Sequence, residues 1–369
     1  MKKKILVICN SSSGFYRLRK ELIAEAIKLY DITILAPDTG YTDNMIKMGC
    51  SYKPIDYDGH GTNPIEETRL ISRYKKEIKD FKPDIVLTYA IKPNTYAGII
   101  CQNQKIPYIV NITGLGTAVE YKSVLQIVTL ALYRLSLRKA KMVFFQNNEN
   151  LEFMKQHNTL GVNNYSLIPG SGVNLDQYRI KPYPKDSKIR LVFIARVIKE
   201  KGIDQFIAAA NYFADNPDVE FHVCGKCGGE YTSLMAELNE RNILIYHGVV
   251  EGLDNIAKIY EMASCIVHPS YYPEGISNVL LEASASGRPI ITTDRSGCRE
   301  VVDDNVNGLL IRQKDSKDLI EKIKKFVSLP CDKRREMGLA GRAKVEHEFD
   351  RKIVINSYMT EIEKAVKGC

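Results

Sequence analysis

The sequence predicts an α/β protein with two doubly wound, Rossmann-like domains that face each other across a cleft. The first observation is length, because 369 residues exceed what one ordinary hydrophobic core covers. The second is the alternation of short, continuously apolar runs with helix-like segments, which is typical of parallel strands covered by helices on both faces. The third is that this alternation starts afresh near the middle of the chain, which indicates two domains of the same kind.

Each expected element follows from a run of apolar residues. In the first half these runs predict strands at residues 4–9, 32–35, 84–88, 108–111 and 142–145, with a helix over 18–30. In the second half they predict strands at 189–194, 220–224, 243–246, 265–268, 289–292 and 308–311. Between the halves, the polar stretch 178–187 contains two prolines and predicts a linker. We therefore expect domains over residues 1–178 and 179–350, and a last amphipathic helix, 351–369, that packs back on the first domain.

Composition limits the class of protein. An apolar share of 44% and a charged share of 26% are those of a soluble globular protein. No apolar run approaches the roughly 20 residues needed to span a bilayer, and the run after Met1 is too short for a signal peptide. The nine cysteines are scattered, which indicates reduced thiols and a cytoplasmic location. Cys224 and Cys227 have redox or zinc spacing, but no second pair accompanies them, so we expect no metal site.

The positive charge is concentrated in the first half of the chain. Residues 1–179 hold 24 Lys and Arg against 16 Asp and Glu, whereas residues 180–369 hold 28 of each. This surplus predicts an anionic partner for the first half. The chain has no Arg-rich helix, no aromatic RNA-binding motif and no tryptophan, so nucleic acid is not expected. An anionic membrane surface or a diphosphate-bearing acceptor fits better.

Two carboxylates, Glu274 and Glu282, stand eight residues apart at the start of a predicted helix. At about 100° per residue they lie about 80° apart around the helix and about 12 Å apart along it. Such a pair can address two parts of one elongated polar ligand, and a sugar nucleotide is such a ligand. A capped helix with a solvated face would show the same spacing, and both interpretations stay open at this point.

Two strand-to-helix turns carry residues suited to phosphate. After the predicted strand 189–194 come Arg196, Lys201 and Gly202, which present cations and helix N-terminal amides. A solvated basic turn would look similar. After the first strand, residues 10–17 contain three serines and Gly14, which allows close approach of a ligand. Neither turn is a P-loop, because the sequence GxxxxGK[ST] is absent.

Arg196, Lys201, Glu274, Gly275 and Glu282 together resemble the donor site of retaining family-four glycosyltransferases with the GT-B fold. The resemblance spans essentially the whole chain and is strongest from about residue 190 to 312, where it includes segments 283–289, 297–300 and 308–310. Segments 91–96 and 111–117 look like those of enzymes that extend polyprenyl-diphosphate-linked sugars. None of these motifs is specific to one sugar.

The resemblance implies a role for each matching position. Arg196 and Lys201 would bind the diphosphate of a UDP-sugar and stabilise its charge as it leaves, and Glu274 would act beside the donor sugar. Glu282 would accept hydrogen bonds from the ribose. The other donor-binding positions implied are Gly14, Gly248, Val249, Gly275, Ile276, Ser277 and Asn278. Retention is explained by front-side attack, in which the leaving phosphate takes the acceptor proton, and no metal is required.

The chain departs from the family pattern on the acceptor side. Many members have a glycine pair where this chain has Ser13 and Gly14, and many carry a histidine in the loop that here reads 111–114. These departures make a histidine-assisted step doubtful. The acceptor-side candidates are then Lys92, Asn94, Thr113 and Arg299. His268, at a strand end, is either functional or an ordinary buried histidine.

Residues 119–141 form an apolar helix pattern flanked by basic residues. This combination predicts a helix that lies in the interface of an anionic membrane, at the inner face of the cell membrane. A buried helix with a basic end would give the same pattern, and this alternative stays open.

The most specific hypothesis is a retaining glycosyltransferase in surface polysaccharide or glycan assembly. It would move a hexose or N-acetylhexosamine from a UDP-sugar to a polyprenyl-diphosphate-linked saccharide, with the first domain binding acceptor and the second binding donor. The alternatives are a UDP-sugar epimerase of the same fold and a non-catalytic sugar-nucleotide-binding protein.

Overall fold

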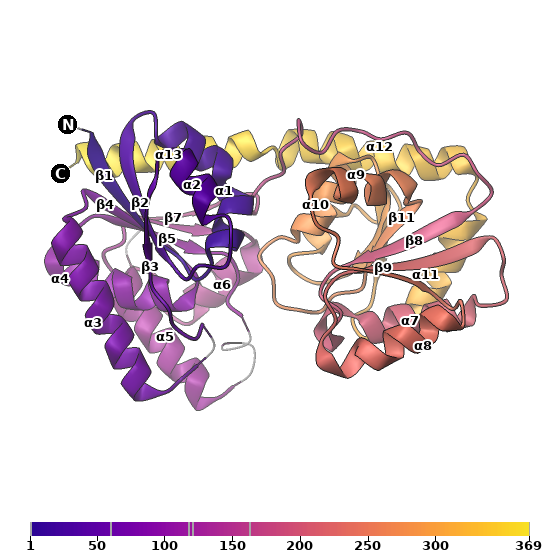
Figure 1. Cartoon of the computed structure of the whole chain (residues 1–369), viewed down its shortest axis with the longest axis horizontal. Helices are drawn as coiled ribbons and strands as arrows, with labels where there is room; N and C mark the ends of the chain where they lie inside the picture. Colours follow the sequence, from indigo (N-terminus) through magenta and orange to yellow (C-terminus); the bar gives the residue numbers. More distant parts are fainter. Residues whose placement is uncertain (1, 60, 117–118, 120–121, 162–163, 369) are drawn as a thin grey trace. The chain divides into compact units, whose positions relative to one another are not determined.

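The protein is described from a computed structural model that places residues 2–59, 61–116, 119, 122–161 and 164–368. The chain divides into two compact units, which Figure 1 shows. The first unit comprises Met1–Ser171, Pro273–Gly275 and Lys352–Cys369, and the second comprises Gly172–Tyr272 and Ile276–Arg351. The chain thus leaves the first unit at residue 171, seven residues before the predicted boundary at 178.

The first unit is built on a parallel sheet of seven strands in the order β3-β2-β1-β4-β5-β6-β7. The strands are β1 (Lys3–Ile8), β2 (Tyr30–Ala36), β3 (Ser51–Pro54), β4 (Ile85–Tyr89), β5 (Tyr108–Ile112), β6 (Met142–Phe145) and β7 (Tyr165–Leu167). The sequence prediction missed β3 and β7. Both are short strands at the sheet edges with mostly exposed or half-exposed residues, so neither has the apolar run that marks a central strand.

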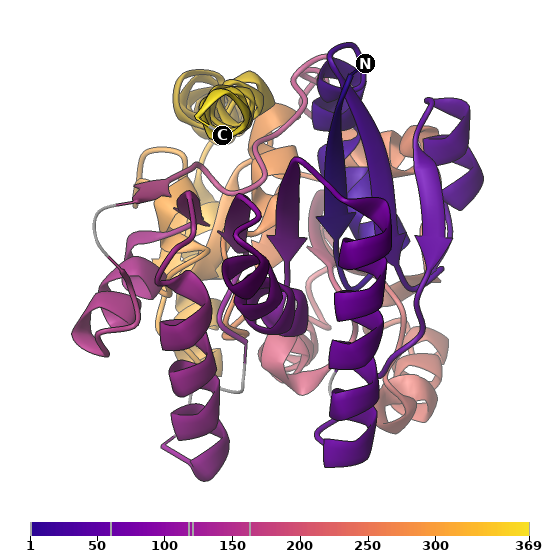
Figure 2. The same ribbon diagram turned by 90° about the vertical axis from the view of Figure 1, so that its left-hand side faces the viewer.

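Helices cover both faces of this sheet, as Figure 2 shows from the side of the first unit. On one face, α1 (Ser12–Ala26) and α13 (Arg351–Lys367) pack on β1, β2 and β4. The other face is covered by α3 (Pro64–Phe81), α4 (Gly98–Gln104), α5 (Val124–Leu137) and α6 (Asn148–Gln156). The short α2 (Thr42–Lys47) and a π-helix, Pro93–Ala97, complete the helices considered below.

The second unit repeats the arrangement with six parallel strands in the order β10-β9-β8-β11-β12-β13. These are β8 (Ile189–Ile194), β9 (Val219–Cys224), β10 (Ile245–Gly248), β11 (Cys265–His268), β12 (Ile290–Thr293) and β13 (Gly308–Ile311). Its helices are α7 (Ile203–Tyr212), α8 (Thr232–Glu240), α9 (Leu253–Met262), α10 (Asn278–Ala285), α11 (Ser316–Ser328) and α12 (Cys331–Glu348).

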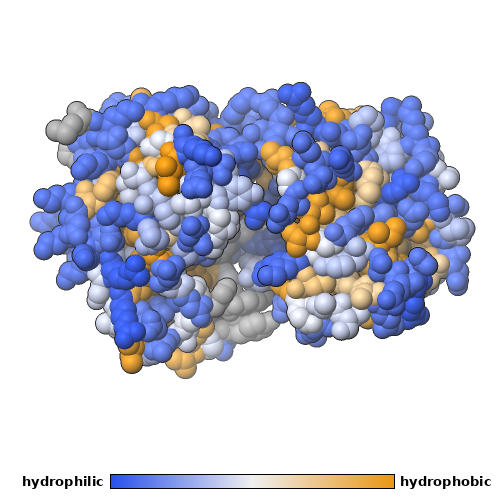
Figure 3. All heavy atoms as spheres, viewed as in Figure 1, coloured by the Kyte–Doolittle hydropathy of each residue, from blue (hydrophilic) through white to orange (hydrophobic). Residues whose placement is uncertain are grey.

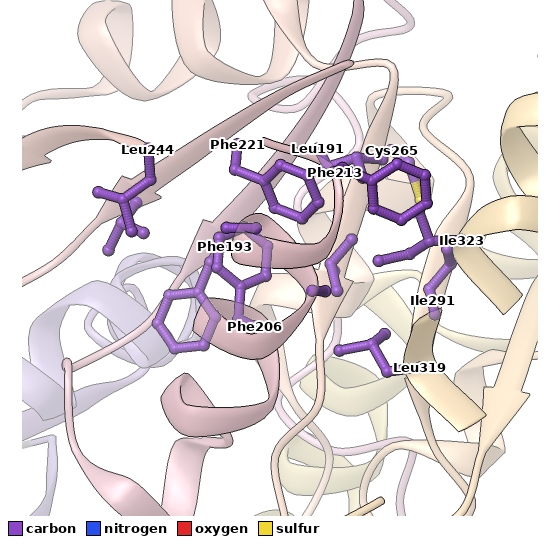
Figure 4. Packing of buried hydrophobic residues seen from close by; sticks show 14 of the residues in the cluster. Leu191, Phe193, Phe206, Phe213, Phe221, Leu244, Cys265, Ile291, Leu319 and Ile323 are labelled. Carbon is purple, nitrogen blue, oxygen red and sulfur yellow. The ribbon is translucent and has the colours of Figure 1, made fainter. Parts of the chain in front are cut away.

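Buried apolar side chains join the second sheet to its helices. Figure 4 shows Phe193, Phe206 and Phe221 packed together on one face. The ring centroid of Phe206 lies 5.5 Å from that of Phe193 and 5.2 Å from that of Phe221. On the other face, α9, α10 and α12 pack on β8, β11 and β12. Burial of a large apolar side chain stabilises a fold by roughly 1.5–3 kcal/mol, so the helices on the two faces stabilise this sheet.

Both sheets reverse their strand order at one point, between β1 and β4 in the first unit and between β8 and β11 in the second. In open parallel sheets ligands bind outside the carboxyl ends of the strands at such a switch point. The predicted α/β class with two doubly wound parallel sheets is confirmed. Among the residues that the structure places, no helix is both long and apolar enough to cross a membrane.

Candidate functional site

The turn that follows β8 carries Arg196 and Lys201. Arg196 is exposed, and Lys201 ends a 3-10 turn, Lys199–Lys201, just before α7. Gly202 has φ +79°, and a Cβ atom there would lie 2.1 Å from the carbonyl oxygen of Pro269. Only glycine allows this close approach, so the Lys-Gly sequence is what lets the turn pack on the loop after β11.

That loop brings one aromatic ring to both cations. The guanidinium carbon of Arg196 lies 5.5 Å from the ring centroid of Tyr272, and the Nζ of Lys201 lies 4.9 Å from it. The structure therefore gathers two positive charges at the switch point of the second unit, where an anionic ligand would bind. Sequence reasoning missed Tyr272, because a loop aromatic has no periodicity. Its only signal is its place between the end of β11 and Glu274.

The carboxyl end of β10 leaves its backbone accessible. Gly248 has φ +67°, and a Cβ atom added there would meet no atom within 4 Å. Its carbonyl oxygen accepts a hydrogen bond of 2.7 Å from the amide of Gly225, which fixes the position of the peptide. Val249 is 56% exposed. A flat, partly apolar group such as a nucleobase would find open space and an apolar side chain here.

The start of α10 is held at the end of β11. Ser277 is the residue before the helix, and its amide donates to the carbonyl of Gly297 over 2.8 Å. The hydroxyl of Ser277 lies 3.3 Å from Nε2 of His268. His268 is buried, and its carbonyl accepts a hydrogen bond from Thr292. These contacts indicate that His268 holds the loop and helix start. Asn278 is the first residue of α10, and Ile276 is buried in front of it.

Glu282 lies in the second turn of α10 and is half-buried. Its Oε2 accepts a hydrogen bond of 2.9 Å from the hydroxyl of Tyr260, and the Tyr260 ring meets that of Tyr178 edge to face. Burial, and after it the negative charge of Glu282, raises the pKa of the Tyr260 and Tyr178 hydroxyls. Both hydroxyls therefore stay protonated. The bond from Tyr260 holds the carboxylate in one orientation, and sequence reasoning missed this residue too.

Glu274 and Gly275 belong to the first unit, because the division passes between Gly275 and Ile276. The buried side-chain amide of Asn147 donates to the carbonyl of Glu274 over 3.0 Å and to that of Gly275 over 2.7 Å. A Cβ atom on Gly275 would lie 2.1 Å from Oε1 of Gln146 and 2.4 Å from the carbonyl of Thr113. The structure thus groups these two residues with the ends of β5 and β6, and groups Ile276, Ser277, Asn278 and Glu282 with the second unit.

Gly14 lies in the first turn of α1, because the helix starts at Ser12 and not near residue 18 as predicted. The earlier start has a local cause. The side chain of Ser11 caps the helix and accepts a hydrogen bond of 3.1 Å from the amide of Gly14. Thr39, from the loop after β2, adds a hydroxyl that lies 2.8 Å from that of Ser11. Gly14 therefore presents a helix start lined by hydroxyl groups.

Lys92 and Asn94 follow β4 but occupy different environments. The Nζ of Lys92 donates to Glu67 and to the carbonyl of Asp58, each over 2.6 Å, and Tyr96 donates to the same carboxylate over 2.7 Å. Asn94 is buried and donates to the carbonyl of Asn111 over 2.8 Å, a contact that joins the π-helix to β5.

Thr113 and Arg299 complete the predicted acceptor side. Thr113 is exposed at the end of β5 in the first unit. Arg299 belongs to the second unit, where its Nε pairs with Asp294 over 3.2 Å. The structure therefore places Lys92, Asn94 and Thr113 at neighbouring strand ends of the first sheet, whereas Arg299 belongs to the second unit.

Two family models match this chain. Residues 4–147 match a model described as glycosyl transferase 4-like, and residues 176–344 match one described as glycosyl transferases group 1. The two matches together span most of the chain, and the second contains Arg196, Lys201, Glu274 and Glu282.

Two relatives align with this chain, one over nearly its whole length and one over less than half of it. An N,N'-diacetylbacillosaminyl-diphospho-undecaprenol alpha-1,3-N-acetylgalactosaminyltransferase from Campylobacter jejuni is 25% identical, and the alignment covers 99% of this chain and all of the relative. An alpha-maltose-1-phosphate synthase from Mycolicibacterium smegmatis is 33% identical over 43% of each chain.

Solved structures share the fold. A sucrose-phosphate synthase from Thermosynechococcus elongatus superposes with a TM-score of 0.77 at 18% identity, and both chains are fully covered. The Anabaena protein Alr3699/HepE, solved in complex with UDP, gives a TM-score of 0.78 at 16% identity, with 99% of this chain and all of that chain covered. The two parallel sheets and these solved structures show that the chain has the GT-B fold. The two family matches show that it belongs to the glycosyltransferases, with a glycosyl transferase 4-like domain followed by a group 1 domain.

Proposed function

We propose that this glycosyltransferase moves a hexose or an N-acetylhexosamine from a UDP-sugar to a sugar already linked to a polyprenyl diphosphate, and that it retains the anomeric configuration. The observation that carries the donor half is the pair Arg196 and Lys201 around the ring of Tyr272. Two fixed cations at a sheet switch point suit the diphosphate of a nucleotide sugar. Because they offset its negative charge, the proposed reaction uses no metal.

The uridine and ribose have candidate positions in the same unit. The open backbone at Gly248 and the apolar Val249 suit a base, and Glu282, held by Tyr260, suits the ribose hydroxyls. The solved HepE structures in complex with UDP and with UDP-glucose support a uridine nucleotide for this chain as well. Glu274 would then act beside the donor sugar, with the amides from Gly275 to Asn278 around it.

The acceptor half rests on the relative from Campylobacter jejuni, whose printed name describes transfer to a sugar on diphospho-undecaprenol. The surplus of Lys and Arg in residues 1–179 supports a diphosphate-bearing acceptor for the first unit. Lys92 and Thr113 are its polar candidates at the ends of β4 and β5, and Arg299 is a candidate from the second unit. Asn94 would act through the π-helix that it joins to β5.

In the proposed reaction, an acceptor hydroxyl oxygen bonds to the anomeric carbon on the face from which the nucleoside diphosphate leaves. The bond between that carbon and the diphosphate oxygen breaks, and the leaving phosphate takes the hydroxyl proton. Arg196 and Lys201 stabilise the negative charge that grows on the diphosphate, which is where an enzyme gains most from fixed charges. The protein supplies orientation and charge, and it needs no acid–nucleophile carboxylate pair of the glycosidase kind.

The test is transfer of label from radioactive UDP-glucose, UDP-galactose, UDP-N-acetylglucosamine and UDP-N-acetylgalactosamine to a membrane lipid extract. Label in the organic phase supports the proposal. An altered free sugar nucleotide, with none in the organic phase, would indicate an epimerase. Binding of UDP-sugar with neither change would indicate a non-catalytic protein. Anomeric configuration of the product, read by NMR, tests retention.

We further propose that the enzyme is cytoplasmic and attaches peripherally to the inner face of the cell membrane through α5. Figure 3 shows a largely hydrophilic face on which hydrophobic residues form separate groups. Exposed apolar side chains gather at the start of α5. Val124 is 78% exposed and Ile127 is 69% exposed, and Lys122, Arg138 and Lys139 lie exposed at the two ends of the helix. Glu120 and Tyr121, also in the predicted segment, lie outside the described residues.

The arrangement of helices supports this attachment. Figures 1 and 2 show that α3 and α5 extend past the sheet at the same end of the first unit. At the start of α3, Ile65 is 63% exposed, which adds an apolar side chain at that end. Apolar side chains between cationic ones favour the interface of an anionic bilayer.

A further inference from the structure

Tyr271 and Tyr272, two neighbouring tyrosines of the loop after β11, meet different cations. The ring of Tyr272 has both Arg196 and Lys201 over it, whereas the ring of Tyr271 has Lys314 over it, with Nζ 4.8 Å from the centroid. A tyrosine face attracts a cation through its quadrupole. Tyr272 is thus the point at which the two predicted diphosphate-binding side chains converge.

Backbone hydrogen bonds position the loop that carries this ring, independently of the cations. The amide of Tyr272 lies 3.3 Å from the hydroxyl of Ser270, which is fully buried. The amide of Tyr271 donates to the carbonyl of Glu200 over 2.9 Å, so the loop is joined to the turn that carries Lys201. The close approach of Gly202 to Pro269 joins the same two segments a second time.

We propose that Tyr272 is a positioning residue, which holds Arg196 and Lys201 in the arrangement that binds the diphosphate of the nucleotide. This inference rests on the proposed function, because it assumes a nucleoside diphosphate at this site.

Two physical effects make such a residue useful. Arg196 and Lys201 carry like charges and repel each other, so without a ligand their flexible side chains would move apart. Each also loses side-chain entropy when a ligand fixes it. A ring that attracts both cations before the ligand arrives reduces the cost of ordering at binding, which raises affinity through preorganisation. The effect is confined to the diphosphate, since the base and ribose are assigned to Gly248, Val249 and Glu282.

The test compares UDP with uridine, which lacks the phosphates. Calorimetry gives both dissociation constants for the wild type, Tyr272→Leu, Tyr272→Phe and the matched control Tyr271→Leu. We expect Tyr272→Leu to weaken UDP binding by about tenfold, the order of effect of a lost cation–π contact, and to leave uridine binding unchanged. Tyr272→Phe keeps the aromatic ring and should bind UDP as the wild type does. Tyr271→Leu should bind both ligands as the wild type does.

The outcomes separate the two proposals. If the wild type binds UDP and Tyr272→Leu binds it equally well, the positioning role is wrong and the proposed function stands. Equal loss of UDP and uridine in Tyr272→Leu also overturns the positioning role, because it means general damage to the site. If the wild type does not bind UDP, the proposed donor site is wrong and this inference falls with it.

Discussion

At the scale of single residues, Arg196 and Lys201 are the positions on which the proposed chemistry depends most. We expect Arg196→Ala and Lys201→Ala each to lower turnover by well over tenfold, because each removes a charge that stabilises the leaving diphosphate. Arg196 is exposed and Lys201 half-buried, so stability should change little. Initial rates of label transfer and thermal unfolding measure the two effects.

The matched control for these variants is Lys199→Ala. Lys199 is an exposed lysine of the same 3-10 turn, so it tests whether any loss of positive charge near α7 has the same effect. We expect it to keep near wild-type turnover. Near-normal turnover in Arg196→Ala and Lys201→Ala would remove both side chains from the mechanism.

His222 gives the second unit a dependence on pH. Its Nδ1 lies 2.9 Å from Nε2 of His247, and its Nε2 lies 3.5 Å from the Glu220 carboxylate, which Arg190 also pairs with. Burial first, and then His247, lowers the pKa of His222 from 6.5 to about 4. Between about pH 4 and pH 6.5, His222 is therefore protonated in the unfolded chain and neutral in the folded chain. Stability from neutral His222 is present above pH 6.5 and is lost as pH falls towards about 4.

His222→Asn should remove this dependence. We expect the free energy of unfolding of the wild type, relative to the variant, to decrease by on the order of 2 kcal/mol between pH 7 and pH 4.5. Urea unfolding at several pH values measures it. A wild-type-to-variant difference that stays constant over this range would contradict the assignment.

Residue identity alone predicted some of the site and not the rest. Arg196 and Lys201 follow an apolar strand at a turn, so their place at a strand end was accessible from the sequence. Tyr260 and Tyr272 were not, because their roles depend on which loop or helix packs beside them.

Arg288 is a similar case: it is fully buried and donates to backbone carbonyls, including that of Pro182 over 2.6 Å. Segment 178–187, predicted as a linker, is tied into the second unit by these bonds.

At the scale of elements, α5 is the segment that we propose binds the anionic membrane surface. Replacement of both Val124 and Ile127 by Asp puts two negative charges where the helix exposes its most accessible apolar residues. We expect this double variant to lose most binding to phosphatidylglycerol vesicles in a sedimentation assay. Each basic residue near anionic lipid contributes roughly 1 kcal/mol, so binding by the wild type should also fall as salt rises.

The control for α5 is Val306→Asp. Val306 is 57% exposed in the second unit, so it is a comparable change on a surface that we do not assign to the membrane. It should bind vesicles as the wild type does. A wild type that stays in the supernatant at low salt, or a double variant that sediments with vesicles as fully as the wild type, would show that α5 is not the attachment site.

Prediction of the elements succeeded where burial gives a strong pattern. Central strands such as β1, β4 and β8 are nearly continuous apolar runs, because both faces are covered by helices. The pattern of apolar residues predicted the start of α1 about six residues too late. The first turn of the helix is polar, and the Ser11 cap determines where it begins. The edge strands β3 and β7 have no such pattern, so only pairing with a neighbour defines them.

At the scale of the whole molecule, the chain returns to the first unit for its last helix. Val354, Tyr358, Ile362 and Ala365 of α13 are buried in the core beside α1 and β4. The hydroxyl of Tyr358 also hydrogen-bonds the Asn111 side chain. The second unit, in contrast, ends at Arg351, whose amide donates to the carbonyl of Val173 over 3.0 Å. Apart from Arg351, the helix is therefore part of the first unit, and its buried side chains complete that unit's core.

Removal of residues 352–369 should unfold the first unit selectively. Loss of these buried apolar side chains, at roughly 1.5–3 kcal/mol for each large one, costs on the order of the whole stability of a domain, about 5–15 kcal/mol. Limited proteolysis read by mass spectrometry should show rapid cleavage within residues 2–161 and protection within 189–345. A chain lacking only residues 367–369 is the control and should keep both units protected. Full protection of the first unit in the longer truncation would mean that its other helices alone complete the core, and that α13 only covers it.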